Sequence, residues 1–377
     1  MDLNFTDEQQ MLKDMTREFL EAECPKALVR SMEHDDLGYP EELWSKMAEL
    51  GWMGLVFPEE YGGAEFAFED MAILLEEMGR AILPGPFFST VVLCGQAILD
   101  SGTEEQKAEF LGKIVNGELI MALGLTEPEG YYGASDITTQ AGLSGSDYVI
   151  NGSKFFVADA LAANCFIVVA RTSESEDPRQ GISLFIVDSD SPGITVSPLG
   201  MLGIDKQGQI QFDNVIVPSE RLLGADGKGW DIVEKLMVWG AIGKCAESVG
   251  GAEAAMEQAV SYVSGRNAFG QTIGSLQAIQ HHCANMLVDV ETSRLLTYQA
   301  ASLVSEGKFQ AEQISIAKAW VSDAYGRVTS LAHQCHGGIA FTKEMDIHLY
   351  HKKAKVNQQL FGDAYFHQQR ITDSLEA

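Results

Sequence analysis

Near the C-terminal end of the chain, a pair of glycines precedes an acidic residue. Gln334, Gly337 and Gly338 lie at the end of an expected helix, and Glu344 follows six residues after Gly338. Adjacent glycines permit a ligand to approach the backbone closely, because they carry no Cβ. A carboxylate beside such a site can serve as a general base, but an acidic residue at a helix start usually only compensates the helix dipole. Spacing alone favours that simpler role for Glu344.

Two further segments carry groups that suit a phosphate or a planar ring. Leu125, Thr126 and Ser135 belong to a loop of small and hydroxyl-bearing residues after an expected strand, where backbone N–H groups can approach an anion. Arg266 and Phe269 follow a long helical stretch and offer a guanidinium for a pyrophosphate and an aromatic edge for a ring. The same residue types also occur without a binding role. The first segment could be an ordinary glycine-containing loop, and the second could be a helix end with a solvated arginine.

The charge balance limits the classes of partner. The chain of 377 residues has 26 basic and 54 acidic residues, a formal net charge of −28. Such a field repels phosphate backbones and anionic lipids, so nucleic acid and membrane surfaces are excluded as principal partners. The six cysteines and eight histidines show no spacing typical of a metal site, and no metal is expected. The chain has no leader pattern and no apolar run of roughly 20 residues, so we expect a cytoplasmic protein.

The hydrophobic period changes twice along the chain, which predicts three segments. Residues 1–118 have helical spacing, beginning with a capping box of Thr6 and Gln9. The apolar face predicted for that first helix consists of Met11, Leu12, Met15, Phe19 and Leu20. Residues 119–226 consist of short alternating or apolar runs, which indicate an antiparallel β domain, with Asn151-Gly152 as a hairpin turn. Residues 227–377 return to helical spacing.

The last segment predicts a four-helix bundle, because four long helical stretches follow one another. These stretches cover residues 230–263, 273–306, 310–335 and 344–371. The predicted fold class is therefore α+β, with an N-terminal helical domain, a middle antiparallel β domain and a C-terminal four-helix bundle. A fold of this kind does not by itself name a reaction.

Taken together and in this order, the motifs resemble the acyl-CoA dehydrogenase family over essentially the whole chain. Each motif alone is weak evidence for a family, whereas several motifs in the same order and spacing are specific for one. They are Leu125-Thr126-Glu127-Pro128, the strand over residues 212–218, Arg266-x-x-Phe269-Gly270-Gln271, and Gln334-x-x-Gly337-Gly338 with Glu344 after it. The spacing from Gly337-Gly338 to Glu344 is similar to the family's spacing between a glycine pair and its catalytic base, so the resemblance implies that Glu344 is the base.

The resemblance implies an FAD cofactor between the β domain and the bundle, shared in part with a neighbouring subunit. A homodimer or homotetramer is therefore expected, or a heteromeric assembly. The implied cofactor contacts are Leu125, Thr126, Ser135, Phe156, Val157, Ala158, Arg266, Phe269, Gln334, Gly337, Gly338 and Gly362.

The implied reaction is α,β-dehydrogenation of an acyl-CoA to a 2,3-enoyl-CoA in lipid catabolism. Glu344 would take the α-proton while the β-hydride passes to flavin N5, and an electron-transfer flavoprotein would accept the electrons.

Several positions depart from the family pattern. Phe156-Val157-Ala158 replaces the usual Trp-Ile-Thr, and the loop over residues 128–136 is longer and carries two tyrosines. The Asp-x-x-Arg pattern that holds acyl-CoA is missing at residues 238–241, and Gly240 fills the position of the base in a minority branch. The segment around Glu344 resembles a bacterial subgroup acting on bulky or steroid side-chain acyl-CoAs.

These departures leave two alternatives open. The first is a non-catalytic or half-site partner subunit of a heteromeric acyl-CoA dehydrogenase. The second is an acyl-CoA oxidase or a desulfinase-like variant. The sequence does not specify the acyl group, because the shape of its pocket depends on helix packing.

Overall fold

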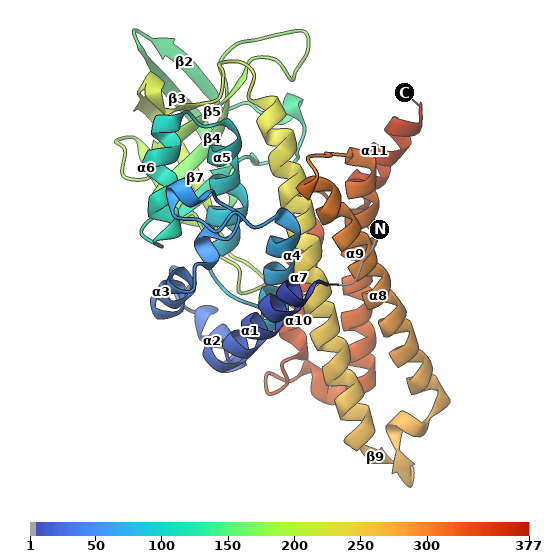
Figure 1. The fold of residues 1–377 in the computed structure, drawn as a ribbon. Coiled ribbons are helices and arrows are strands. Elements are labelled where there is room, and N and C mark those ends of the chain that lie inside the picture. Colours follow the sequence, from blue (N-terminus) through green and yellow to red (C-terminus); the bar gives the residue numbers. More distant parts are fainter. Residues whose placement is uncertain (1–4, 377) are drawn as a thin grey trace. The chain divides into compact units, whose positions relative to one another are not determined.

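The structure is a computed structural model that describes residues 5–376 (Figure 1). The chain forms two compact units. One contains the residues up to Arg30, Ala67–Leu83 and the chain from Gly240 onwards, and the other contains Ser31–Phe66 and Pro84–Trp239. The units cut across the three contiguous segments of the sequence, because α1 (Asp7–Glu23) packs against α4 (Phe68–Ala81), and α4 packs against α8 (Gln277–Ser305).

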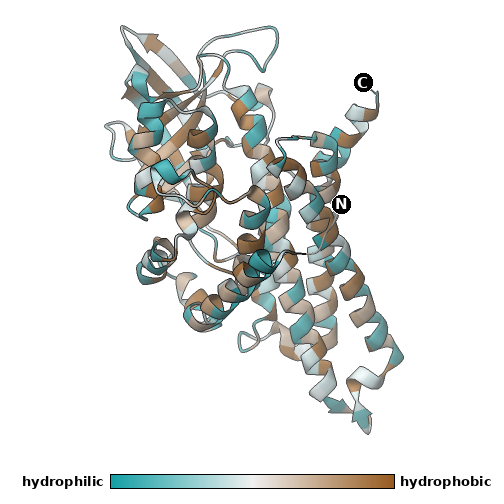
Figure 2. Cartoon of the chain, in the orientation of Figure 1, coloured by the Kyte–Doolittle hydropathy of each residue, from teal (hydrophilic) through white to brown (hydrophobic). Residues whose placement is uncertain are grey.

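An eight-stranded sheet is the centre of the unit formed by Ser31–Phe66 and Pro84–Trp239. Its strands are β1 (Met121–Gly124), β2 (Gln140–Ser144), β3 (Asp147–Ala158), β4 (Cys165–Arg171), β5 (Ile182–Asp188), β6 (Ile194–Pro198), β7 (Gln207–Val217) and β8 (Leu222–Leu223). The order is β6-β7-β3-β2-β4-β5-β8, with β1 beside β4. The pairs are antiparallel except that β4 runs parallel to β1 and β2. β4 and β5 are apolar and buried on both faces. Apolar residues of the sheet are brown in Figure 2.

The predicted turn at Asn151-Gly152 is wrong, because β3 continues through these two residues. The tight turn lies instead at Gly145 (φ +67°), which connects β2 to β3. Gly152 has φ +143°, and a Cβ on it would lie 2.7 Å from Thr139 Oγ1. The pairing of β3 with β7 shifts its register at this point. The glycine therefore permits a bulge and a close strand contact rather than a chain reversal.

Helices complete this unit. They are α3 (Glu41–Glu49), η1 (Trp52–Gly54), η2 (Glu59–Tyr61), the π-helical η3 (Phe88–Gly95), α5 (Gln96–Ser101), α6 (Glu104–Val115) and residues 230–239 of α7. A capping box at Thr103 begins α6. Trp44 Nε1 donates to the carbonyl of Gly117 at 2.8 Å, which fixes α3 beside the end of α6.

The other unit is helical. Its elements are α1 (Asp7–Glu23), α2 (Lys26–Met32), α4 (Phe68–Ala81), α7 (Trp230–Gly265), α8 (Gln277–Ser305), α9 (Ala311–His336), η7 (Gly337–Phe341), α10 (Ile347–Gln359) and α11 (Ala364–Glu376), with a hairpin of β9 (Asn267–Ala268) and β10 (Gln271–Thr272) between α7 and α8. The fourth predicted stretch of the bundle is interrupted, because Phe361 and Gly362 adopt positive φ between α10 and α11.

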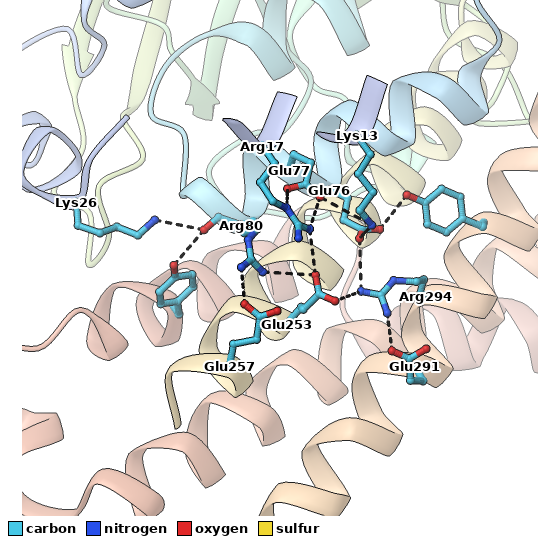
Figure 3. Close-up of polar contacts among 12 residues, drawn as sticks. Lys13, Arg17, Lys26, Glu76, Glu77, Arg80, Glu253, Glu257, Glu291 and Arg294 are labelled. Carbon is cyan, nitrogen blue, oxygen red and sulfur yellow. Dashed lines mark hydrogen bonds and ion pairs between the residues drawn. The ribbon is translucent and has the colours of Figure 1, made fainter. Parts of the chain in front are cut away.

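The buried face of α1 differs from the prediction. The exposed fractions of Met11 and Met15 are 62% and 61%, whereas Lys13 is buried. Lys13 Nζ lies 2.7 Å from Glu76 Oε1, and Arg17 binds the carboxylate of Glu77 through two hydrogen bonds (Figure 3). The helix docks through its cations because two buried carboxylates on α4 require counter-charges. Leu20 is buried as expected.

None of the helices between residues 5 and 376 combines the length and hydropathy that a bilayer-spanning segment needs.

We expect Lys13→Met to lower the free energy of unfolding by about 3 kcal/mol, because Glu76 would lose its nearest counter-charge. Thermal and denaturant unfolding measure this change. Lys308→Met is the control, because it breaks an ion pair with Glu306 in which both side chains are exposed. That change is expected to cost less than about 1 kcal/mol. Equal effects of the two substitutions would contradict a structural role for the buried pair.

Candidate active site

The loop after β1 is joined to β3 by backbone and hydroxyl contacts. Leu125 and Thr126 are buried. Thr126 Oγ1 donates to the carbonyl of Phe155 at 2.6 Å, and the Phe155 N–H donates to the carbonyl of Thr126 at 2.9 Å. The structure therefore brings two residues of the first predicted motif directly beside the end of β3.

A buried ion pair lies beneath this loop. Lys154 Nζ lies 2.7 Å from Glu127 Oε1 and 3.2 Å from the carbonyl of Leu125. The backbone N–H groups of Thr138 and Thr139 also donate to the Glu127 carboxylate. Glu127 belongs to the motif at residues 125–128, but the sequence pattern assigned it no role. Lys154, a lysine within the apolar run of β3, is the sequence feature from which its buried partner could have been found.

The ionisation of this pair follows from burial and from mutual attraction. Burial would raise the pKa of Glu127, but Lys154 and the hydrogen bonds from Thr138 and Thr139 outweigh burial and lower this pKa to about 2. Burial lowers the pKa of Lys154 to about 8. Both groups are therefore charged at neutral pH and hold the loop in place.

The end of β3 presents an aromatic ring at a bulge. Phe156 has φ +56° and an exposed fraction of 44%, while the pairing with β7 shifts between Lys154 and Val157. Val157 is buried and Ala158 is half-buried. A Cβ on Gly130 would lie 3.5 Å from the Phe156 ring, so the longer loop passes close to this ring.

Ser135 lies in the short helix η4 (Ala134–Asp136), and its side chain is exposed. Arg171 donates to the carbonyls of Ala134 and Ile137 at 2.8 and 3.2 Å, which holds this turn against β4. The structure therefore keeps the Ser135 hydroxyl on an anchored loop.

In the helical unit, the β9–β10 hairpin presents two of the predicted residues. Phe269 has φ +54°, and its exposed fraction is 90%. Arg266 is exposed, and its guanidinium makes no ion pair or hydrogen bond with residues 5–376. A cation and a large apolar ring, three residues apart in the chain, are thus both exposed at this hairpin, as at a binding surface.

The glycine pair after α9 is exposed. Gly337 has φ +67°, whereas Gly338 has no such conformational need. A Cβ on either residue would meet no atom within 4 Å. Packing within this chain therefore does not explain Gly338, and the space beside it is open to a ligand. Gln334, one turn earlier, is also exposed.

His336 is a buried neighbour of the glycine pair. Its Nδ1 lies 2.8 Å from the carbonyl of Ala332, and its ring stacks on Tyr262 with centroids 4.6 Å apart. Its Nε2 has no hydrogen-bond partner among the described residues. The ring is thus oriented by two contacts and retains one unused polar atom.

Glu344 lies in a turn between η7 and α10, three residues before the helix begins at Ile347. The expectation that it opens the last helix is wrong. Its side chain is exposed, and within residues 5–376 its carboxylate forms no hydrogen bond or ion pair. A carboxylate without such partners is free to receive a proton from a ligand.

At two positions, packing within the chain explains why the residue is glycine. Gly362 is buried with φ +92°, and a Cβ on it would lie 2.3 Å from the Phe366 ring. A Cβ on Gly240 would lie 2.4 Å from the Phe361 ring. No acidic side chain fits at Gly240 unless this ring moves, which leaves Glu344 as the candidate base.

The predicted residues thus form two groups, one in each unit. The β-sheet unit holds Leu125, Thr126, Ser135, Phe156, Val157 and Ala158, and the helical unit holds Arg266, Phe269, Gln334, Gly337, Gly338, Glu344 and Gly362.

Comparisons with known proteins cover the whole chain. Three family profiles match it: "Acyl-CoA dehydrogenase, N-terminal domain" at residues 6–118, "middle domain" at 122–215 and "C-terminal domain" at 227–375. The chain is 34% identical over 363 residues to a short-chain specific acyl-CoA dehydrogenase of Clostridium acetobutylicum, covering 95% of each chain. It is 31% identical to subunit CarC of the caffeyl-CoA reductase-Etf complex of Acetobacterium woodii, covering 98% and 99%.

Among solved structures, butyryl-CoA dehydrogenase from Megasphaera elsdenii is similar, with a TM-score of 0.92 and 33% identity over 100% of both chains.

We expect Lys154→Met to destabilise the loop after β1 by about 3 kcal/mol, because Glu127 would lose its buried counter-charge. The flavin content per chain, measured by absorbance, should fall with it. In the wild type, the contribution of Glu127 is present above the ordinary pKa of 4.5 and is lost as the pH falls toward about 2. Lys107→Met removes an exposed pair with Glu104 and serves as the control. Unchanged stability and flavin content in Lys154→Met would contradict this role.

Proposed function

The chain belongs to the acyl-CoA dehydrogenase family, and from this premise we propose that it converts an acyl-CoA to the 2,3-enoyl-CoA with Glu344 as the base. Members of this family are FAD-dependent flavoproteins and oxidoreductases. The observation that carries the proposal is the exposed carboxylate of Glu344, which is unpaired within residues 5–376 and follows six residues after the exposed glycine pair Gly337-Gly338. The nearby carboxylate of Asp346, in contrast, already forms an ion pair with Arg30.

The residues present fit an FAD. Phe156 offers a ring and an irregular backbone at a bulge, which suits contact with a flat group. Arg266 and Phe269 offer an exposed cation and an exposed ring. When bound, FAD supplies the acceptor for the hydride that leaves the substrate Cβ.

Each group of residues has a proposed part in holding that cofactor. Leu125, Thr126 and residues 156–158 would contact the flavin ring, and Ser135 the pyrophosphate. The ADP half would be held from an adjacent protomer by Arg266, Phe269, Gln334, Gly337 and Gly338. Gly362 would shape the turn near that end. This sharing requires an oligomer, either a homodimer or homotetramer or a heteromeric assembly.

The proton transfer depends on Glu344. The α-proton of a thioester is weakly acidic, so the thioester carbonyl requires a hydrogen-bond donor, for which we propose the backbone N–H of Glu344. A bound acyl chain would cover the exposed carboxylate and remove water from it. Desolvation raises the pKa of a carboxyl group toward that of the proton it must accept.

An electron-transfer flavoprotein is the proposed partner for reoxidation. Support comes from the relative that is named as a subunit of a reductase-Etf complex. The same relative is named as part of a reductase complex, and in the reverse direction Glu344 would return the proton to an enoyl thioester, with the hydride coming from reduced FAD. A cytoplasmic location and a role in lipid catabolism belong to this proposal.

We expect Glu344→Gln to retain FAD and to lose at least a hundredfold in the rate of flavin bleaching. The measurement is anaerobic mixing of the holoenzyme with a panel of acyl-CoA thioesters. Glu312→Gln, which changes an acidic residue in the first turn of α9, is the control and should bleach like the wild type. A Glu344→Gln variant with most of the wild-type rate would remove Glu344 from this role. Hydrogen peroxide or sulfite release would identify the oxidase or desulfinase-like alternative.

A second prediction separates the homomeric enzyme from the half-site partner subunit. The chain expressed alone should purify as a yellow oligomer whose flavin bleaches with at least one acyl-CoA. Size-exclusion chromatography with absorbance detection gives the flavin content for each assembly. A colourless chain that gains flavin and activity only with a second gene product would identify the partner subunit instead.

A further inference from the structure

The turn that carries Glu344 is attached to a helix from the other end of the sequence. Arg30 on α2 forms an ion pair with Asp346 through Nη2 and Oδ1. Both side chains are about one-third exposed. Asp346 is the N-cap residue of α10, yet its side chain makes no capping hydrogen bond. Its carboxylate serves the contact with α2 instead of its own helix.

The α10 side of this turn is held firmly. Ile347, Leu349 and Tyr350 are buried. Tyr350 Oη donates to the carbonyl of Arg80 at 3.0 Å, at the C-terminal end of α4. The start of α10 is therefore attached both to α4 and, through Asp346, to α2.

Helix α2 is held at the same place. Lys26 Nζ donates to the carbonyl of Arg80 at 3.2 Å (Figure 3) and to that of Ala81 at 2.6 Å. The Arg80 carbonyl thus accepts from both α2 and α10. Because α2 is anchored there, Arg30 is presented to Asp346 from a fixed support rather than from a mobile segment.

The other side of the turn is also fixed. Thr342 donates to the carbonyl of Ile339 through its N–H at 3.1 Å and through Oγ1 at 2.9 Å, which ends η7. Only residues 343–345 lie between the two anchored points. His348 Nδ1 lies 2.6 Å from the carbonyl of Met345, which further restricts this segment. A base that has no hydrogen bond of its own depends on such tethers for its position.

We propose that Arg30 is a positioning residue for the base, acting through Asp346 and the turn. This inference rests on the proposed function, in which Glu344 takes the α-proton. Proton transfer is sensitive to displacements of about 1 Å, which can change a rate by roughly a hundredfold. Without the guanidinium, the α10 side of the turn would lose its connection to α2, and the Glu344 carboxylate would sample positions away from the α-carbon.

The test is the rate of anaerobic flavin bleaching in the holoenzyme, measured by rapid mixing with an acyl-CoA that bleaches the wild type. We expect Arg30→Met to slow bleaching 10- to 100-fold. FAD content and the concentration dependence of bleaching should stay within about twofold. Substrate deuterated at Cα should slow the variant at least as much as the wild type, because proton removal limits the rate. The reversed pair Arg30→Asp with Asp346→Arg should recover most of the lost rate.

The control is Arg327→Met, which removes a two-bond contact with Asp289 between α8 and α9, away from the turn. It should bleach at the wild-type rate. A wild-type rate in Arg30→Met, or a loss that follows FAD content and is not recovered by the reversed pair, would overturn the positioning role while the proposed function stands. A wild type that no acyl-CoA bleaches, or a Glu344→Gln variant that bleaches normally, would overturn the proposed function and this inference with it.

Discussion

The helical unit depends on two adjacent carboxylates that are buried on one helix. Glu76 and Glu77 of α4 have almost no exposed surface. Buried charges are tolerated only when counter-charges and hydrogen bonds surround them. Lys13 and Arg17 come from α1, while Arg294 and Tyr298 come from α8, and all four reach these carboxylates (Figure 3). The requirement for counter-charges therefore determines which helices meet at α4.

The packing of α4 against α7 adds a steric constraint to this electrostatic one. A Cβ on Gly250 would lie 1.7 Å from the Glu76 carbonyl oxygen, and a Cβ on Gly79 would lie 2.0 Å from that of Glu247. The backbones of the two helices are in direct contact, and this contact fixes the axial position of α4 along α7. The last carbonyls of α4 then receive Lys26 and Tyr350. The helix that organises the unit is thus also the support of the turn that bears Glu344.

Local structure was predictable where the cause is local. The capping box at Thr6 and the periods of the long helices depend on residues within one or two turns, and the structure confirms them. The predicted turn at Asn151-Gly152 was wrong because Thr139, the residue just before β2, sets the space around Gly152. The face of α1 was wrong for a similar reason, since partners about 60 residues away along the chain bury its cations.

The candidate site shows the same division between local and distant causes. Residue types and spacing are sufficient to select Glu344 and the glycine pair from a resemblance. They do not reveal the contact of Lys154 with Glu127 or that of Arg30 with Asp346, whose members are 27 and 316 residues apart. Glu127 and Asp346 are each neutralised by a cationic partner, whereas Glu344 has no such partner among residues 5–376. That contrast becomes visible only when the distant contacts are known.

The Phe361 ring against Gly240 bears on how this chain can change over evolutionary time. Gly240 on α7, which the resemblance in sequence aligns with the base of a minority branch, has no room for even a methyl group. A single substitution to an acidic residue there would collide with the ring before it gained any chemistry. Moving the carboxylate from the turn to α7 therefore demands two coordinated replacements, at positions 240 and 361, and a lineage that carries this aromatic contact is held to the arrangement it has.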